Sequence, residues 1–135
     1  MDALPPFDLI RPNTLDEVLK ARAAHPNSRP LGGGTDLTVN IRRGIATPPV
    51  LIEMNGVAEL RAIKANANSI EVGASVTLTE LSQHPDVQRF YPVIAQAAHQ
   101  IAGPTHRRMG TVGGNICLDT RCIYYNQSEW WRDAN

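Results

Sequence analysis

The sequence predicts an α+β protein with a small βαβ lobe followed by a second α+β lobe. The apolar run "PPVLIEM" at 48–54, which prolines precede, is typical of a buried strand. A helical pattern begins after Thr14. After residue 57 the pattern changes to short alternating segments, typical of strands, followed by helical segments. A chain of 135 residues suits one domain of ordinary size. We therefore place the first lobe at 1–57 and the second at 58–116.

The first predicted helix follows a capping box. Thr14 and Glu17 stand three residues apart, so the side chain of each can bond a free backbone amide at the helix start. Apolar residues then recur at helical spacing until Pro26, where the helix should end. The residues that this helix should turn toward the core are Leu15, Val18, Leu19 and Ala23.

Two interpretations compete for the segment "TDLTVNIRRG" at 35–44. Its alternating apolar residues suit a strand. A helix is favoured because Thr35 or Asp36, directly after glycines, is a good N-cap. A helix would also supply the crossover between a short strand at 28–31 and the buried strand at 48–54.

The second lobe begins with a predicted hairpin at 60–74, which folds around an Asn-Ala-Asn turn. Its apolar positions are Ile63, Ile70 and Val72. Two helices should follow, "TLTELSQHP" and the longer "DVQRFYPVIAQAAHQIA". The residues that the longer helix should offer to the core are Val93, Ile94, Ala97, Ala98 and Ile101.

Composition excludes several classes of protein. Hydrophobic residues make up 42% of the chain and charged residues 19%, which is neither a disordered nor a membrane composition. Thirteen basic residues balance thirteen acidic ones, so no general electrostatic case exists for binding nucleic acid or an anionic membrane. No secretory signal and no apolar run of membrane-spanning length is present. We expect a cytoplasmic protein whose two cysteines are thiols or ligands rather than a disulfide.

Two glycine-rich turns are the main candidates for a binding site. The first is Gly32-Gly33-Gly34-Thr35-Asp36, and the second runs from Thr111 to Asn115 with paired glycines inside it. Glycines let backbone amides approach a ligand closely, and successive amides at a helix start form a nest for an anion. A tight turn is the commoner explanation of either motif alone. Two such turns on two lobes could clasp one extended anion, for which a dinucleotide pyrophosphate is the natural candidate.

Together these segments resemble a known family. "LGGGTDLTVNIRRG" followed by "HRRMGTVGGNI" is similar to the FAD-binding, or medium, subunit of the molybdenum hydroxylases, the group of xanthine dehydrogenase and carbon monoxide dehydrogenase. "FDLIRPNTLDEVLKA" and "IEVGASVTLTEL" also fit that pattern, so the likeness spans most of residues 7 to 116. The resemblance implies the FAD-binding fold of the vanillyl-alcohol-oxidase and molybdenum-hydroxylase flavoproteins, with the second lobe incomplete.

The resemblance implies an FAD site and assigns residues to it. Backbone of both lobes would surround the FAD pyrophosphate, while the flavin carries the redox chemistry and no side chain acts as an acid or base. FAD would pass electrons between an outside donor or acceptor and iron-sulfur clusters. The implied cofactor-binding residues are Leu31, Gly32, Gly33, Gly34, Thr35, Asp36 and Leu37 in the first lobe, and Thr111, Val112, Gly113, Gly114 and Asn115 in the second.

Within the family, the segment 117–135 looks like the β subunit of 4-hydroxybenzoyl-CoA reductase. "CLDTRCIYYNQSEWWRDAN" stands where most members carry a small Ser-Pro segment. In that reductase this region begins an inserted loop that holds an additional [4Fe-4S] cluster, and Cys122 matches its first ligand. Such a cluster needs about four thiolates, and this chain has two cysteines, so it cannot bind the cluster alone. We expect Cys117 to pack under the second glycine turn.

The density of aromatic residues near the C-terminus predicts that a core or a partner surface covers them. Tyr124, Tyr125, Trp130 and Trp131 fall in the last twelve positions, and aromatics this dense normally have a core or a partner over them. We expect a truncated product, an N-terminal piece, or one half of a split subunit. An alternative is a non-catalytic module that self-associates through this aromatic tail and holds no flavin.

The resemblance also implies partners and a reaction. A molybdopterin subunit and a [2Fe-2S] subunit would complete the enzyme, and ferredoxin would donate low-potential electrons. The net reaction would remove the phenolic hydroxyl of 4-hydroxybenzoyl-CoA to give benzoyl-CoA. The alternative within the enzyme class is a medium FAD subunit of another molybdenum hydroxylase with a different substrate.

Overall fold

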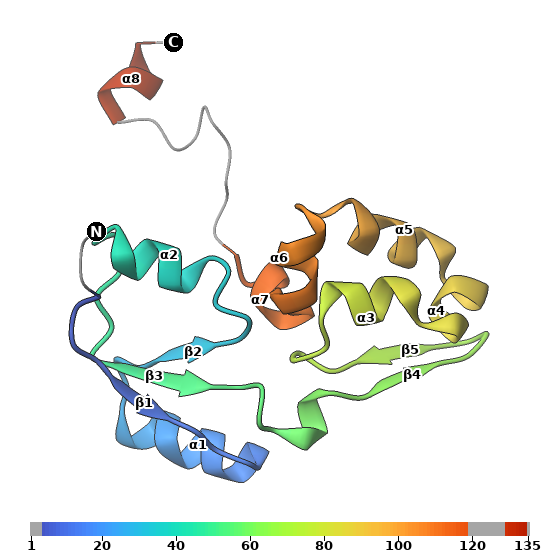
Figure 1. Cartoon of the computed structure of the whole chain (residues 1–135), viewed down its shortest axis with the longest axis horizontal. Coiled ribbons are helices and arrows are strands. Elements are labelled where there is room, and N and C mark those ends of the chain that lie inside the picture. The colour runs from blue at the N-terminus through green and yellow to red at the C-terminus, as the bar shows by residue number, and fades with distance from the viewer. Residues whose placement is uncertain (1–3, 119–128, 135) are drawn as a thin grey trace.

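A computed structural model describes residues 4–118 and 129–134 of the chain. The first lobe contains a three-stranded parallel sheet of β1 (Asp8–Ile10), β2 (Arg29–Leu31) and β3 (Val50–Glu53) in the order β1-β3-β2. Helix α1 (Leu15–Ala24) covers one face of this sheet and α2 (Leu37–Arg42) the other (Figure 1). The predicted crossover helix at 35–44 is confirmed. The strand β1 was not predicted.

The capping box of α1 forms with one shift. Thr14 Oγ1 accepts a hydrogen bond from the Glu17 amide at 3.2 Å, as predicted, but Glu17 Oε2 accepts from the amide of Asn13 at 2.7 Å. Of the residues expected to face the core, Val18 is buried, whereas Leu15 and Leu19 are 41% and 62% exposed. The prediction was wrong for these leucines because α1 turns the stripe of Val18 and Ala21 toward the sheet.

The core of the first lobe centres on β3. Leu51 and Ile52 are each 1% exposed, since β3 pairs with a strand on both sides and has a helix over each face. This position explains why the run reads as continuously apolar instead of alternating. Ile52 packs with Val18 and Val57 beneath α1.

The second lobe is a hairpin covered by helices on one face. Strands β4 (Ile63–Ala65) and β5 (Ile70–Val72) pair antiparallel, with Ile63 opposite Val72. The predicted Asn-Ala-Asn turn is confirmed, because Asn66 Oδ1 accepts hydrogen bonds from the amides of Asn68 and Ser69. A 3₁₀ turn, η1 (Ala58–Leu60), precedes the hairpin, and the helices α3 (Leu78–Gln83), α4 (Pro85–Phe90) and α5 (Pro92–Gln100) follow it.

The long helix predicted over 86–102 is two helices. Pro92 restarts the helix after Tyr91, which takes φ −135° and ψ 54°. Of the residues expected to face the core, Ala98 is buried, whereas Val93 and Ile94 are 75% and 36% exposed; α5 also buries Ala95, which was not predicted. Small residues three apart allow α5 to pack closely on α3 and α4, where Val87 is fully buried.

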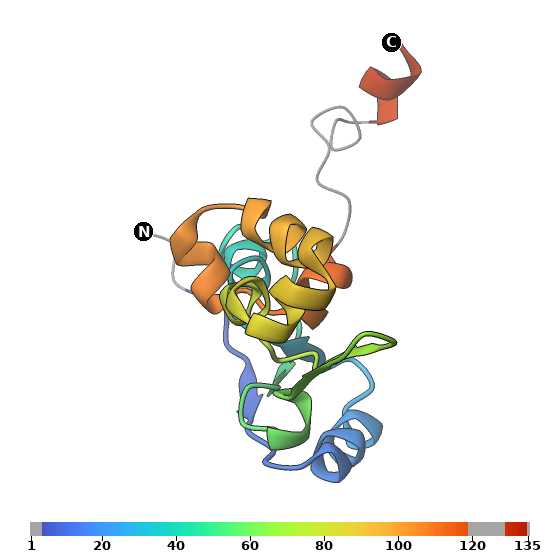
Figure 2. The same ribbon diagram turned by 90° about the vertical axis from the view of Figure 1, so that its right-hand side faces the viewer.

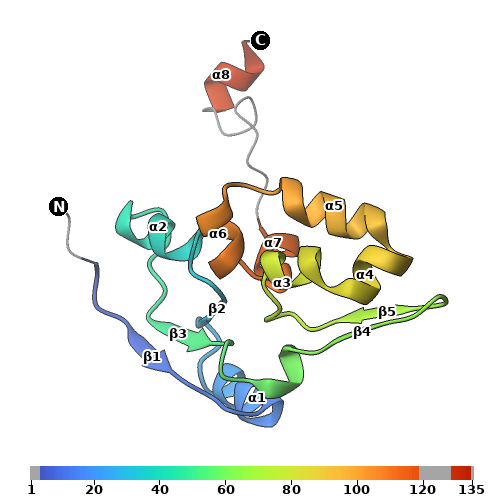
Figure 3. The ribbon, with the colours of Figure 1, turned by 45° about the vertical axis from the view of Figure 1, so that its right-hand side comes forward.

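Three short helices end the described chain, namely α6 (Pro104–Met109), α7 (Val112–Ile116) and α8 (Glu129–Asp133). Helices α6 and α7 lie where the two lobes meet, between α2 and the helices of the second lobe (Figures 1 and 3). Figure 2 shows the same chain from the side, with the three-stranded sheet below these helices. Among the described residues, no helix has the length and apolar character needed to cross a membrane.

Candidate flavin-phosphate site

The first glycine turn begins at the carboxyl end of β2, where Leu31 is the last strand residue and Leu37 the first residue of α2. The next segment supports it, because the Met54 amide donates to Leu31 O at 2.9 Å and Asn55 Nδ2 donates to Gly32 O at 3.3 Å. Ligands of open parallel sheets bind at the carboxyl ends of strands, which is where this turn lies.

The turn leads into α2 without the expected side-chain cap. Asp36 occupies the N-cap position, but its side chain accepts a hydrogen bond from Asn40 Nδ2 at 2.9 Å and makes no capping bond to the helix amides. The hydroxyl of Thr38 donates instead to Gly34 O. Gly34 has φ 71°, a left-handed backbone conformation that residues other than glycine adopt only with strain.

The second turn is anchored to the start of α3. Thr111 pairs with Thr77 in an isolated antiparallel bridge, flanked by hydrogen bonds from the Leu78 amide to Gly110 O at 3.0 Å and from the Val112 amide to Val76 O at 2.8 Å. Thr111 is 4% exposed and its Oγ1 caps α7 by accepting from the Gly114 amide at 3.2 Å. Sequence reasoning treated this stretch as a loop, but the structure makes 112–116 a helix, since Thr111 supplies the N-cap.

The two turns meet, as the sequence predicted. A Cβ atom added to Gly32 would lie 2.6 Å from Thr111 Oγ1, and one added to Gly33 would lie 1.6 Å from the carbonyl oxygen of Met109. Real Cβ atoms do not come this close to backbone, so Gly33 is required for one lobe to dock against the other, while a side chain at Gly32 would have to displace the Thr111 hydroxyl. Close approach between the turns is therefore a second use of these glycines, beside the approach of a ligand.

Free amides are concentrated on the first turn. Among the described residues, no acceptor receives the amide hydrogens of Gly32, Gly33, Gly34 or Thr35, which are half-buried and follow one another through a bend in which Gly34 has left-handed backbone. Successive amides in such a bend form a concave set of donors that fits the oxygens of a phosphate or diphosphate. This donor set is what a nucleotide phosphate requires.

The second turn supplies fewer free amides than expected. The amide of Val112 donates to Val76 O, that of Gly113 to Ala74 O at 2.9 Å, and that of Asn115 to Thr111 O at 2.9 Å. With Gly114 bonded to the Thr111 hydroxyl, only the Thr111 amide of this turn has no acceptor among the described residues. The expectation that the second turn is donor-rich was wrong, because folding of α7 and its docking on the second lobe use four of its five amides.

The cysteine predictions have different outcomes. Cys117 follows α7 and its side chain is exposed, so the expected packing under the second glycine turn is wrong. Cys122, the predicted cluster ligand, and the aromatic pair Tyr124 and Tyr125 lie outside the described residues. Within 4–118 and 129–134, no group of three or more His, Cys, Asp or Glu side chains is arranged to hold a metal ion.

Glu80 stabilises the start of α3, to which the second turn is anchored through Thr77, and this role was not predicted from the sequence. Its carboxylate accepts hydrogen bonds from both the amide and the hydroxyl of Thr77 at 2.8 Å, and it forms an ion pair with Arg61 at 3.4 Å. The hydrogen bond from the Thr77 backbone is the largest cause that holds the pKa of Glu80 below its usual range, and Arg61 adds to it. The motif T-x-x-E at 77–80 was the signal available for this capping box.

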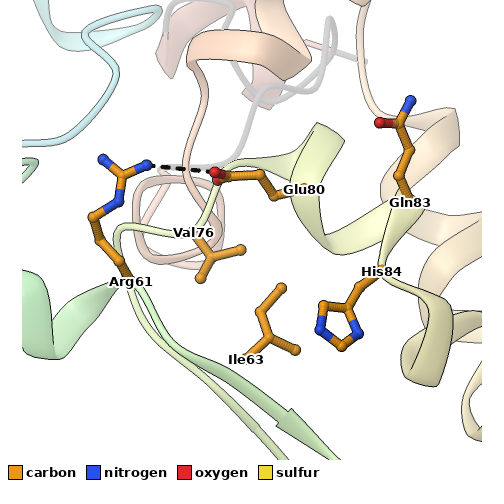
Figure 4. Close-up of a pocket in the computed structure, with 6 residues that line it drawn as sticks. All are labelled: Arg61, Ile63, Val76, Glu80, Gln83 and His84. Carbon is orange, nitrogen blue, oxygen red and sulfur yellow. Dashed lines mark hydrogen bonds and ion pairs between the residues drawn. The ribbon is translucent and has the colours of Figure 1, made fainter.

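A separate pocket lies beside the hairpin. It has a volume of about 350 Å³ and is lined by Arg61, Ile63, Val76, Glu80, Gln83 and His84 (Figure 4). The pocket shares no residue with either glycine turn, so it is not the space in which the turns would hold a phosphate.

The family follows from comparison of this sequence with known proteins. Residues 5–126 match the family model described as "FAD binding domain in molybdopterin dehydrogenase". The chain belongs to this family of FAD-binding domains. The structure accordingly has the FAD-binding fold that the resemblance implied, with a mixed α/β arrangement and the medium chain of a carbon monoxide dehydrogenase among its structural neighbours.

Relatives of the domain come from several enzymes. The chain is 34% identical over 108 residues to the xanthine dehydrogenase FAD-binding subunit of Escherichia coli O157:H7, covering 79% of this chain and 37% of the relative. It is 32% identical over 112 residues to the nicotinate dehydrogenase FAD-subunit of Eubacterium barkeri, covering 82% and 38%. The carbon monoxide dehydrogenase medium chain of Hydrogenophaga pseudoflava is 32% identical over 113 residues, with 83% and 39% covered.

Solved structures agree with these sequence relatives. The carbon monoxide dehydrogenase of Hydrogenophaga pseudoflava superposes with a TM-score of 0.81 at 31% identity, covering 84% of this chain and 40% of that one. Quinoline 2-oxidoreductase of Pseudomonas putida 86 gives a TM-score of 0.79 at 29% identity, covering 83% and 39%. This chain spans less than half of the length of the curated relatives that it matches.

Proposed function

We propose that the chain binds the diphosphate of FAD at the first glycine turn and serves as an electron-transfer module of a molybdenum-hydroxylase-type oxidoreductase. The observation that carries the proposal is the set of free amides on Gly32 to Thr35, closed on one side by Thr111, in a chain that belongs to an FAD-binding family. Bound flavin would supply the redox chemistry. The protein's own part is to bind and orient, and no side chain at the turns is placed as an acid or base.

Each turn has a distinct part in this proposal. Gly32, Gly33, Gly34 and Thr35 donate amide hydrogens to phosphate oxygens, and the start of α2 adds the positive end of its backbone dipoles. Thr111 contributes its own amide, and Gly113 and Gly114 let α7 dock closely enough to hold Thr111 there. The ends of the two turns are fixed by flanking residues. These are Leu31, Asp36 and Leu37 at the first turn, and Val112 and Asn115 at the second.

A competition titration of the full chain tests this function. The fluorescence of FAD should change on binding to the chain, and ADP and inorganic pyrophosphate should displace FAD, because both present a diphosphate to the same amides. Riboflavin, which has no phosphate, should not displace FAD at equal concentration. Displacement by riboflavin as effective as by ADP, or no FAD binding at all, would contradict diphosphate recognition by this chain.

A finer proposal concerns the parent enzyme. The segment 117–135, with its Tyr-Tyr-Asn-Gln-Ser-Glu-Trp-Trp-Arg run, favours a 4-hydroxybenzoyl-CoA reductase that accepts electrons from ferredoxin and releases the phenolic oxygen as water. The partners would be a molybdopterin subunit and a [2Fe-2S] subunit, and Cys122 would ligate a [4Fe-4S] cluster with thiolates from elsewhere. A cytoplasmic location belongs to the same proposal. The relatives act in other enzymes, named for xanthine, nicotinate and carbon monoxide.

The activity and iron content of the complete enzyme complex distinguish the reductase from another molybdenum hydroxylase. Purified from its source, it should form benzoyl-CoA from 4-hydroxybenzoyl-CoA with reduced ferredoxin, and should contain iron and acid-labile sulfide beyond that of the [2Fe-2S] subunit. Oxidation of a hydroxylase substrate such as xanthine, without benzoyl-CoA formation, would instead identify another molybdenum hydroxylase.

A further inference from the structure

Ser75 lies between the supports of the two glycine turns. It is 3% exposed and belongs to the short segment that leads from β5 to α3. The residues on either side of Ser75 hold the second turn. Ala74 O accepts a hydrogen bond from the Gly113 amide at 2.9 Å. Val76 O accepts one from the Val112 amide at 2.8 Å, so the backbone around Ser75 is fixed to the second turn.

The hydroxyl of Ser75 reaches the support of the first turn. Ser75 Oγ donates a hydrogen bond to Met54 O at 3.0 Å, and Met54 is the residue that follows β3. The amide of Met54 in turn donates to Leu31 O, where the first turn begins. The next residue, Asn55, donates from Nδ2 to Gly32 O. One buried side chain therefore joins the backbone that holds the second turn to the backbone that holds the first.

The Ser75 hydroxyl is not needed to satisfy the backbone around it. Met54 O also accepts a hydrogen bond from the Val57 amide at 3.2 Å, and the amide of Ser75 donates to Leu60 O at 2.8 Å. Removing the hydroxyl therefore leaves both of these backbone groups with a partner, and the cost to folding should be small. The main effect of the hydroxyl is to fix how the two supporting segments lie relative to each other.

This relative position matters because both turns contribute amide hydrogens that have no acceptor among the described residues. Four belong to Gly32 to Thr35 and one belongs to Thr111. Gly33 and the Met109 carbonyl set the closest approach of the turns. A hydrogen bond weakens as its donor turns out of line with the acceptor. A small movement between the supports would therefore misalign the Thr111 amide with an anion that the first turn holds.

We propose that Ser75 is a positioning residue of the flavin-phosphate site. Its hydroxyl holds the two turns at the separation at which their free amides reach one diphosphate. Ser75 acts without contacting the ligand, through the backbone of Met54 on one side and of Ala74 and Val76 on the other. The inference rests on the proposed function and adds to it a residue that lies outside both glycine turns.

FAD titration of the full 135-residue chain and of two serine variants tests the inference. Ser75→Ala should weaken FAD binding by about fivefold, which is the effect of one misaligned hydrogen bond. Ser82→Ala is the matched control, because Ser82 is also buried and its hydroxyl also donates to a backbone carbonyl at 3.0 Å, that of Thr79. This bond lies within α3 and away from both turns, so Ser82→Ala should leave FAD affinity unchanged.

A double-mutant cycle shows whether Ser75 acts through the separation of the turns. Gly33→Ala forces the turns apart by itself, because the added carbon would meet the Met109 backbone. In that background, Ser75→Ala should weaken FAD binding by less than about twofold further. A second measurement needs no flavin. Amide NMR of Ser75→Ala should show shifted resonances at Gly32 to Thr35 and at Thr111, which Ser82→Ala should not shift.

Several results would overturn the inference. These are an FAD affinity of Ser75→Ala equal to that of the wild type, equal weakening by Ser75→Ala and Ser82→Ala, the full fivefold effect in the Gly33→Ala background, or unchanged resonances at the two turns. Failure of the wild-type chain to bind FAD would instead contradict the proposed function. The resonances of the two turns would then decide by themselves whether Ser75 links them.

Discussion

Gly33→Ala is the most direct test of how the two turns depend on each other. The added methyl group would lie 1.6 Å from Met109 O and 2.3 Å from the Met109 carbonyl carbon, where about 3.0 Å is the lower limit. Both obstructing atoms are backbone, so the turns must separate by about 1.4 Å to admit it. Overpacking of this kind costs about 1–3 kcal/mol of folding free energy, against about 5–15 kcal/mol for a whole domain.

The assays for Gly33→Ala are urea unfolding and FAD titration. We expect a free energy of unfolding lower by about 2 kcal/mol, and FAD affinity weaker by about tenfold or more because Thr111 is moved away from the free amides. Gly103→Ala is the matched control: its φ is −88° and the nearest atom to the added carbon is His106 Nδ1 at 3.8 Å. Because Gly103 is the N-cap of α6, where alanine is less favourable than glycine, the stability of this variant should fall by less than about 1 kcal/mol. Equal behaviour of the two variants would refute the docking argument.

Three further predictions follow from the supports of the site. Glu80 has a lowered pKa in the folded chain, so its contribution is present above the ordinary value of 4.5 and is lost as pH falls below it; Glu80→Gln should flatten that part of a stability profile measured by urea unfolding. Thr111→Val removes the cap on the Gly114 amide and should lower the free energy of unfolding by about 1 kcal/mol in the same assay, while Thr111→Ser should restore it. Arg61→Ala removes an exposed ion pair and should change stability by less than about 1 kcal/mol; a larger loss would give Arg61 a structural role that its contacts do not explain.

Much of the first lobe was predictable because its signals are local. A cap at Thr14, an apolar run ending at Glu53 and glycines ahead of α2 each act within a few residues of the element they define. Strand β1 gave no comparable signal. Its three residues, Asp8–Ile10, become a strand through pairing with β3 some forty residues later, which no local pattern reveals.

The inward face of α5 was only partly predictable. Val93 and Ile94 are exposed because α5 turns Ala95 and Ala98 toward α3 and α4, and the sequence pattern does not show which face these partners cover. The candidate site was also predictable only in part. Convergence of the turns was predicted from the presence of two similar glycine turns on two lobes, whereas the hydrogen bond from the Gly113 amide to Ala74 O depends on tertiary docking.

The strand order β1-β3-β2 also limits when the first lobe can assemble during synthesis. The central strand is the last of the three to be translated, so neither neighbour has a ladder partner until the ribosome has passed Glu53. The nascent chain must hold β1, α1, β2 and α2 without a sheet until then, with their apolar surface available to chaperones. The β4–β5 hairpin, in contrast, closes over a four-residue connection as soon as it is made.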